Sequence, residues 1–212
     1  MQKGVREHKK LSRYKSIVHT AEHLFLESGI DAVQMQDIAV AEGIGIATLF
    51  RYFPKKEKLI VAVAIQSLER MIIQLNNIVQ SSKTAYERLE DVLHYLLINQ
   101  KNEKNAAKFR EAFESYASFA KEPLADIELY IDVQKEITQV LIPIIEDGKS
   151  DGSLRNDIPI KETIITIINT YGTFGNNVLL KTPITYTEED IKPEVQLRIL
   201  KDILLSYVKP LS

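Results

Sequence analysis

The sequence predicts an all-α protein of about nine helices. Apolar residues recur at helical spacing over long stretches of the 212 residues, and short breaks that contain Gly or Pro separate those stretches. The composition, with 45% hydrophobic and 26% charged residues, is ordinary for a globular protein and excludes intrinsic disorder and collagen-like structure. A chain of this length can bury a real core in one large domain, or in a small domain joined to a larger one.

The first three predicted helices are closely spaced. A helix over about residues 8–28 places its apolar side chains on one side, and Gly29 follows as a natural C-terminal cap. Two short helices fit residues 35–42 and 46–52, with Gly43 in the link between them. Their brevity and their short link are typical of a helix-turn-helix.

Four longer predicted helices follow. Thr84 and Glu87 form a capping box at the start of the second, because each side chain can accept a hydrogen bond from the backbone N–H of the other. Pro143 lies inside the last of the four and should kink or shorten it. The predicted ranges are 56–80, 84–99, 103–121 and 124–147.

A loop and two further helices complete the predicted fold. Residues 148–159 are rich in turn-forming side chains and contain two glycines. Residues 160–180 are rich in β-branched side chains, but the stretch is longer than a usual strand of about 3–10 residues, so a helix is predicted. Thr187, followed by three acidic residues, predicts the N-cap of a last helix that ends near Val208.

The composition also excludes several chemistries. Because the chain has no Cys, it cannot hold a disulfide, a thiolate metal site, an iron–sulfur cluster or a cysteine nucleophile. The first fifteen residues lack the apolar run of a secretory signal, and no stretch reaches about 18 uninterrupted apolar residues. We therefore expect a cytoplasmic protein that has no membrane span.

Positive charge is concentrated near the start of the chain. The formal net charge is −2, yet residues 1–60 hold ten Lys and Arg against seven Asp and Glu. The basic N-terminal segment is either a solvated arm or an arm that binds nucleic acid. Most of the excess comes from Lys3, Arg6, Lys9, Lys10, Arg13 and Lys15.

The helix predicted over residues 46–52 has two chemically different faces. On the polar face, Arg51 can reach a guanine or a phosphate, and Tyr52 can donate its hydroxyl to a phosphate. Thr48 can contact a phosphate or a thymine methyl group, and Ala47 allows close approach. The apolar face carries Ile46, Leu49, Phe50 and Phe53.

Lysines follow this helix directly. Lys55 and Lys56 stand at the start of the next predicted helix, where side-chain charge and backbone N–H groups both favour phosphate oxygens. An ordinary amphipathic helix with a lysine-rich edge would show the same local pattern, so the motif alone leaves both interpretations open.

Residues 10–60 resemble the N-terminal DNA-binding domain of the TetR family of bacterial transcriptional regulators. The resemblance implies that residues 46–52 are the recognition helix and that Gln36 lies near bases or backbone. It also implies phosphate contacts for Thr48, Tyr52 and Lys56. The matching residues are Ile17, Ala21, Leu24, Phe25, Gly29, Asp37, Ile38, Ala39, Gly43, Ile44, Thr48, Leu49, Tyr52, Phe53, Lys56, Glu57 and Leu59.

An enzymatic site finds little support. His19 to His23 matches the zinc-binding pattern H-x-x-E-H, but both imidazoles fall on the face opposite the apolar one, and no third ligand is apparent. No catalytic residue, metal ligand or cofactor is predicted, and the protein is not expected to be an enzyme.

Aromatic residues form a stripe in the second half of the chain. Such a stripe is usually core, but it can also line a pocket, and the resemblance implies that an effector binds within this helical region. The pocket would suit an apolar or amphipathic small molecule. The predicted pocket residues are Phe109, Phe113, Tyr116, Tyr130 and Gln134.

The last two predicted helices carry more apolar surface than one core contact requires. They predict a homodimer with a four-helix interface, as the resemblance also implies, although a wholly intramolecular core is the alternative. The predicted interface residues are Ile164, Ile168, Tyr171, Leu200, Ile203, Leu204 and Tyr207.

These observations predict a helix-turn-helix DNA-binding domain with a basic N-terminal arm over residues 1–55, and a helical ligand-binding and dimerisation domain over residues 56–212. The expected protein is a ligand-responsive homodimeric transcriptional repressor, released from a near-palindromic double-stranded DNA operator by a small, largely apolar molecule. The alternative is a helical small-molecule binding protein without sequence-specific DNA binding.

Overall fold

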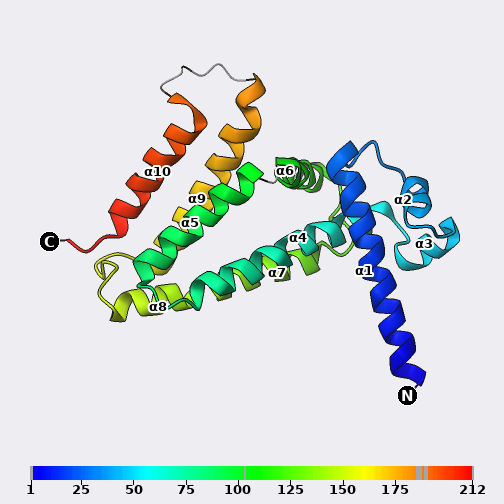
Figure 1. Cartoon of the computed structure of the whole chain (residues 1–212), viewed down its shortest axis with the longest axis horizontal. Helices are drawn as coiled ribbons and strands as arrows, with labels where there is room; N and C mark the ends of the chain where they lie inside the picture. The colour runs from blue at the N-terminus through cyan, green and yellow to red at the C-terminus, as the bar shows by residue number, and fades with distance from the viewer. Residues whose placement is uncertain (1, 103, 185–187, 189–190, 212) are drawn as a thin grey trace. The chain divides into compact units, whose positions relative to one another are not determined.

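A computed structural model describes residues 2–102, 104–184, 188 and 191–211, and within these residues all regular secondary structure is helical, without a strand (Figure 1). The fold class is therefore confirmed. The helices are α1 (Gln2–Ser28), α2 (Met35–Ala41), α3 (Ile46–Tyr52), α4 (Lys56–Val79), α5 (Ala85–Asn102), α6 (Lys104–Phe119), α7 (Ile127–Val140), α8 (Ile142–Ser150), α9 (Ile160–Lys181), the short 3₁₀ helix η1 (Thr182–Ile184) and α10 (Pro193–Val208).

The chain forms two compact units. The first unit comprises residues up to Glu69 together with Lys108–Val133, and the second comprises Arg70–Ala107 together with the residues from Gln134 onward. Helix α4 contributes its first part to one unit and its last part to the other. The predicted domain boundary at residue 55 rests on chemistry rather than on compactness, and it stays a prediction.

Helix α1 ends as predicted but begins earlier. Gly29 has a φ of +85°, and its N–H donates to the carbonyl of Phe25 at 2.9 Å. This left-handed cap ends the helix, because Gly has no Cβ to oppose that conformation. The basic arm expected before residue 8 is part of the same continuous helix, which starts at Gln2.

Helices α2 and α3 form the predicted helix-turn-helix. The backbone N–H of Gln34 donates to Asp37 Oδ2 at 2.8 Å, so a carboxylate caps the start of α2. In the link, Gly43 has a φ of +68°, and the N–H of Ile44 donates to the carbonyl of Ala39 at 3.0 Å. These local bonds turn the chain sharply into α3.

Helix α4 is long and apolar enough, by length and composition alone, to cross a membrane. Half of its most apolar 18-residue window is buried inside the protein, as in the core helix of a globular domain. Its buried side chains include Leu59, Val61 and Val63 in the first unit and Leu75 and Val79 in the second.

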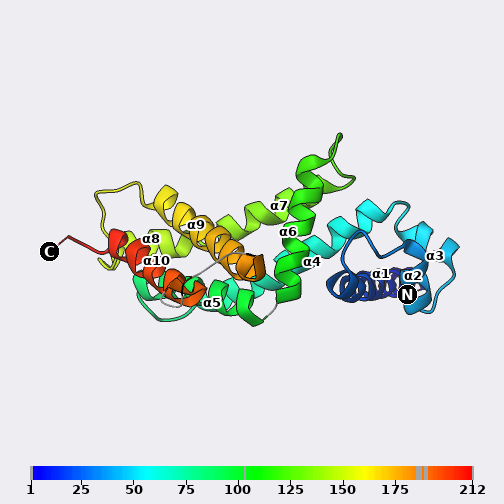
Figure 2. The same ribbon diagram turned by 90° about the horizontal axis from the view of Figure 1, so that it is seen from above.

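The core of the second unit lies among α5, α8, α9 and α10. Helix α9 packs against both α5 and α10, and the two ribbon views agree in placing these helices side by side (Figure 2). Residues 160–181 are helical, which confirms the choice of helix over strand. The predicted helix over 124–147 is divided at Leu141, just before Pro143, as that proline required.

Predicted boundaries were also wrong at α8 and α10. Residues 148–150 are the last turn of α8 rather than a loop. Gly148 is buried there, and a Cβ at this position would collide with the side chain of Leu154, so glycine fits where an exposed turn was expected. Helix α10 begins at Pro193 and not after Thr187, which lies outside the described residues. Pro suits the first turn of a helix because its missing N–H would have no helical partner.

Helix α5 is capped from two directions. Thr84 and Glu87 form the predicted capping box, with the N–H of Thr84 donating to Glu87 Oε2 at 2.9 Å. In addition, the N–H of Ala85 donates to Asp151 Oδ2 at 2.8 Å, and the N–H of Tyr86 donates to Ser153 Oγ at 3.1 Å. The loop after α8 therefore completes the start of α5.

Candidate nucleic-acid interface

Helix α3 presents the two faces that the sequence predicts. Leu49 and Phe53 are buried against the rest of the first unit. Ala47 and Arg51 are exposed, and Thr48 is half-buried beside them. The predicted DNA-facing side chains therefore share the solvent side of a helix whose opposite side is anchored in the core.

One residue of the predicted apolar face is placed differently. Phe50 is 44% exposed, whereas Leu49 is fully buried. Leu49 and Phe53 are four residues apart and define the buried side of α3. Phe50 lies at the edge of that side. An aromatic ring thus borders the polar face.

The other predicted contact residues surround α3. Gln36 is exposed in the first turn of α2, Lys55 is exposed in the turn before α4, and Tyr52 is half-buried at the end of α3. Lys56 is half-buried at the first position of α4. Burial lowers the pKa of Lys56, against the opposing effect of the Asp31 and Asp37 carboxylates.

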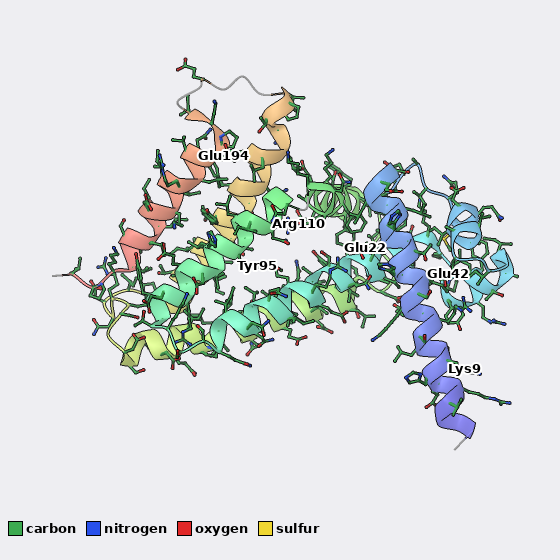
Figure 3. All side chains as sticks on the ribbon, in the orientation of Figure 1. Lys9, Glu22, Glu42, Tyr95, Arg110 and Glu194 are labelled. Atoms are coloured by element: carbon green, nitrogen blue, oxygen red, sulfur yellow. The ribbon has the colours of Figure 1, made fainter. Side chains whose placement is uncertain are left out.

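Glu42 connects the helix-turn-helix to α1, a role that the sequence analysis missed. Its carboxylate is only 5% exposed and accepts hydrogen bonds from Arg13 Nη1 at 3.1 Å, Ser16 Oγ at 2.6 Å and Thr20 Oγ1 at 2.6 Å. The donors lie three, then four residues apart on one face of α1, which was the available signal. Figure 3 labels Glu42 beside α1.

This hydrogen bonding controls the protonation of Glu42. Burial raises the pKa of its carboxyl group, but the hydrogen bonds from Ser16, Thr20 and Arg13 outweigh burial and hold the pKa below its ordinary value of 4.5. The ionised form is therefore favoured in the folded protein. Its stabilisation is present above pH 4.5 and is lost as the pH falls through the lowered value.

Replacing Glu42 by Gln should reduce the free energy of unfolding by about 1–3 kcal/mol at neutral pH, because three donors lose a charged acceptor. Thermal unfolding of wild type and variant across the acid range would measure this. The difference should shrink as the pH falls, because protonation removes the same charge from the wild type. Glu27→Gln, on the exposed end of α1, is the matched control, and an equal loss in both variants would contradict the role of Glu42.

Comparison with known proteins identifies the family to which the helix-turn-helix region is similar. The family model described as bacterial regulatory proteins of the tetR family matches residues 17–63, which include α2 and α3. The N-terminal domain of this chain belongs to the TetR family. The resemblance found in the sequence is thereby confirmed for this domain.

Curated relatives of the TetR-family domain are HTH-type transcriptional regulators of Staphylococcus aureus. One, from strain bovine RF122 / ET3-1, is 36% identical over 81 residues, which cover 38% of this chain and 44% of that protein. Another, from strain USA300, is 33% identical over 97 residues, which cover 46% of this chain and 50% of that protein. The chain thus spans about half the length of these relatives.

Solved structures share the fold of the TetR-family domain and of the helices beyond it. A TetR transcription regulator from Haloarcula marismortui has a TM-score of 0.72 at 17% identity, covering 93% of this chain and 96% of that one. A transcriptional regulator from Saccharomonospora viridis in complex with choline has a TM-score of 0.72 at 18% identity, covering 92% and 97%. FadR from Bacillus subtilis in complex with stearoyl-CoA has a TM-score of 0.65 at 15% identity, covering 92% and 99%.

Most of the predicted pocket residues are core of the unit that contains the TetR-family domain. Phe109 stacks on Phe25 with ring centroids 6.1 Å apart, and Phe113 meets Tyr130 edge-on at 4.8 Å. All four rings are buried. Tyr116 instead borders an open hollow of about 1050 Å³ in the same unit. Gln134 is exposed and lies one helical turn after Tyr130 on α7.

The predicted dimer residues fall into two groups. Ile164 and Tyr171 are fully buried in the core of the second unit, so they pack within the subunit and are not available to a partner. Their β-branched and aromatic character fits both places, and the sequence could not separate them. The half-buried or exposed residues are Ile168, Leu200, Ile203, Leu204 and Tyr207.

The histidine pair of α1 stands apart from other ligands. His23 Nδ1 lies 3.3 Å from Glu27 Oε2, and both side chains are largely exposed. Within the described part of the chain, no group of three or more His, Asp and Glu side chains is placed to hold a metal ion.

Proposed function

We propose that this chain is a cytoplasmic, homodimeric, DNA-binding transcriptional repressor that a small, largely apolar molecule releases from its operator. The polar face of α3 carries the proposal. Ala47, Thr48 and Arg51 are presented to solvent by a helix anchored through Leu49 and Phe53, inside a TetR-family domain. A short helix with this arrangement fits the major groove of DNA.

Each contact residue has a defined chemical role in the proposal. Arg51 reads guanine through two N–H donors, and Ala47 lets the helix approach the base edges. Thr48 and Tyr52 donate hydroxyl hydrogen bonds to phosphates, while Gln36 contacts bases or backbone from α2. Lys55 and Lys56 place positive charge beside the phosphates at the start of α4.

An exposed apolar stripe supports dimerisation. Ile199, Ile203 and Tyr207 lie four residues apart along one face of α10, and each is at least 50% exposed. Leu200 and Leu204 are half-buried next to them. A stripe of this kind is costly to leave in water, and a second copy of α10 would cover it.

A helix that belongs to both units supports control by an effector. Helix α4 has no Gly or Pro between Lys56 and Val79, so a movement at one end is transmitted along a continuous rod. Two structurally similar regulators were solved with choline and with stearoyl-CoA, respectively. By reciprocity, an effector that weakens DNA binding must itself bind the DNA complex more weakly by the same factor.

Selection of genomic DNA fragments on the purified protein tests the proposed function. We expect a preferred near-palindromic sequence whose half-sites lie about one or more helical turns apart, because a twofold dimer presents two copies of α3. Native mass spectrometry of the same preparation would detect a co-purified effector. Recovery of fragments without any shared sequence would contradict the proposal and favour a helical ligand-binding protein.

A further inference from the structure

The predicted DNA contacts do not account for the part of α1 that lies beside α3. A groove of about 770 Å³ lies between the first half of α1 and the polar face of α3, within the first unit. Figure 1 shows the first turns of α1 continuing past α2 and α3, and Figure 3 labels Lys9 in that stretch. The groove is lined by Arg6, His8, Lys9, Lys10, Ser12, Arg13, Ser16, Ile44, Thr48, Arg51 and Tyr52.

The lining has the chemistry of an anion site. It includes five Lys and Arg side chains and no carboxylate, and its hydroxyl groups come from Ser12, Ser16, Thr48 and Tyr52. Arg13 shares its charge with Glu42. Within the described residues, Arg6, Lys9 and Lys10 have no carboxylate partner to neutralise them, so their positive potential is directed into the groove.

Packing within the protein does not explain this stretch of α1. Every residue from Gly4 to Ser12 is exposed, whereas Arg13, Tyr14 and Ser16 contact Glu42 and Phe53, and burial begins at Ile17. Cations in the first turns also oppose the helix dipole, whose N-terminal end is positive, and the first turn holds no acidic residue. The charges therefore weaken the free helix, and an anion along the groove would remove that repulsion.

We propose that the groove holds one sugar-phosphate strand of double-stranded DNA, with Arg6, Lys9 and Lys10 contacting phosphates next to the bases that α3 reads. The proposal rests on the proposed function, because Thr48, Arg51 and Tyr52 belong both to the groove and to the reading face of α3. Phosphate contacts of this kind set affinity and orientation, and base contacts set the sequence preference.

The dimensions favour a polyanion over a single small anion. Arg6 and Arg13 are seven residues apart, which is roughly 10 Å along a helix. One strand of DNA carries a phosphate about every 3.4 Å of helix axis, and successive phosphates are farther apart along the strand itself, so that length spans more than one phosphate. Lys9 and Lys10 lie between the two arginines, which gives a row of cations matched to a strand rather than to one phosphate.

The salt dependence of binding to a short random-sequence duplex tests the groove without requiring the operator. Lys9→Ala should make the slope of log K against log salt less steep by about 0.9, and the triple variant Arg6→Ala/Lys9→Ala/Lys10→Ala by up to about 2.7. Lys15→Ala is the matched control, because Lys15 is an exposed lysine of α1 outside the groove lining, and its slope should equal that of the wild type. Alanine is the strongest helix former, so these variants keep α1.

The possible outcomes distinguish failure of the groove proposal from failure of the proposed function. Equal slopes for Lys9→Ala, the triple variant and Lys15→Ala would overturn the groove proposal, even if the wild type still selects a specific operator. A slope difference without any sequence preference would uphold the groove and overturn the proposed function. If the triple variant keeps the wild-type slope on duplex but loses binding to vesicles of anionic lipid, the groove binds a membrane surface and the proposal is wrong.

Discussion

Ile203→Glu should convert the protein from a dimer into a monomer. Ile203 is 58% exposed at the centre of the α10 stripe, so the substitution spares the subunit core but buries an unpaired charge if two subunits meet there. Operator affinity should fall by about 10²- to 10⁴-fold, because a monomer loses the gain from engaging two half-sites together. Sedimentation velocity at micromolar concentration and operator titration would measure the two effects.

A matched control distinguishes the stripe from a general effect of charge. Arg198→Glu also changes an exposed residue of α10, but on a different face from Ile199, Ile203 and Tyr207. It should remain dimeric and unfold at nearly the temperature of the wild type, whereas Ile203→Glu should lose the part of its stability that comes from association. A dimeric Ile203→Glu protein, or a monomeric wild type, would show that α10 is not the interface.

Arg51→Ala should weaken operator binding by about 1–3 kcal/mol and relax the sequence preference at one base pair of each half-site. The expected loss is large because a guanidinium can donate two parallel hydrogen bonds to guanine, and alanine can donate none. Competition between the operator and single-base variants, measured by fluorescence anisotropy, would locate the affected position.

The variant Arg51→Lys distinguishes recognition of the bases from the contribution of positive charge to binding. Lysine keeps the positive charge on α3 but lacks the planar fork, so the salt slope should stay close to that of the wild type while the sequence preference falls. If both substitutions leave the preference unchanged, Arg51 contacts only phosphate and another side chain reads the bases.

Features that depend on neighbouring residues were predictable from the sequence. The Gly29 cap, the Thr84–Glu87 capping box and the break before Pro143 all follow from local backbone chemistry, and the structure confirms them. The buried side of α3 was predictable for the same reason, since Leu49 and Phe53 share one helical face. Only Phe50, at the edge of that face, was misplaced.

Features that depend on distant residues were not predictable. Periodicity shows that Phe109 and Phe113 share an apolar face, but not that Phe25 and Tyr130 cover it. Ile164 looked available to a partner for the same reason, because a sequence pattern does not reveal which neighbour buries a side chain. The cationic groove was not predictable either, since it exists only where α1 passes α3.

The distant cap of α5 constrains the order in which the second unit is completed during synthesis. The backbone N–H groups of Ala85 and Tyr86 donate hydrogen bonds to the side chains of Asp151 and Ser153, which follow them by 66 and 67 positions. Until that loop has left the ribosome, the first turn of α5 has only its own capping box. Such non-local contacts slow folding because a long loop must close first. The first turn of α5 therefore reaches its final stability only after the loop that follows α8 has been made, while the Gly29 cap and the turn between α2 and α3 use local bonds and can form much earlier.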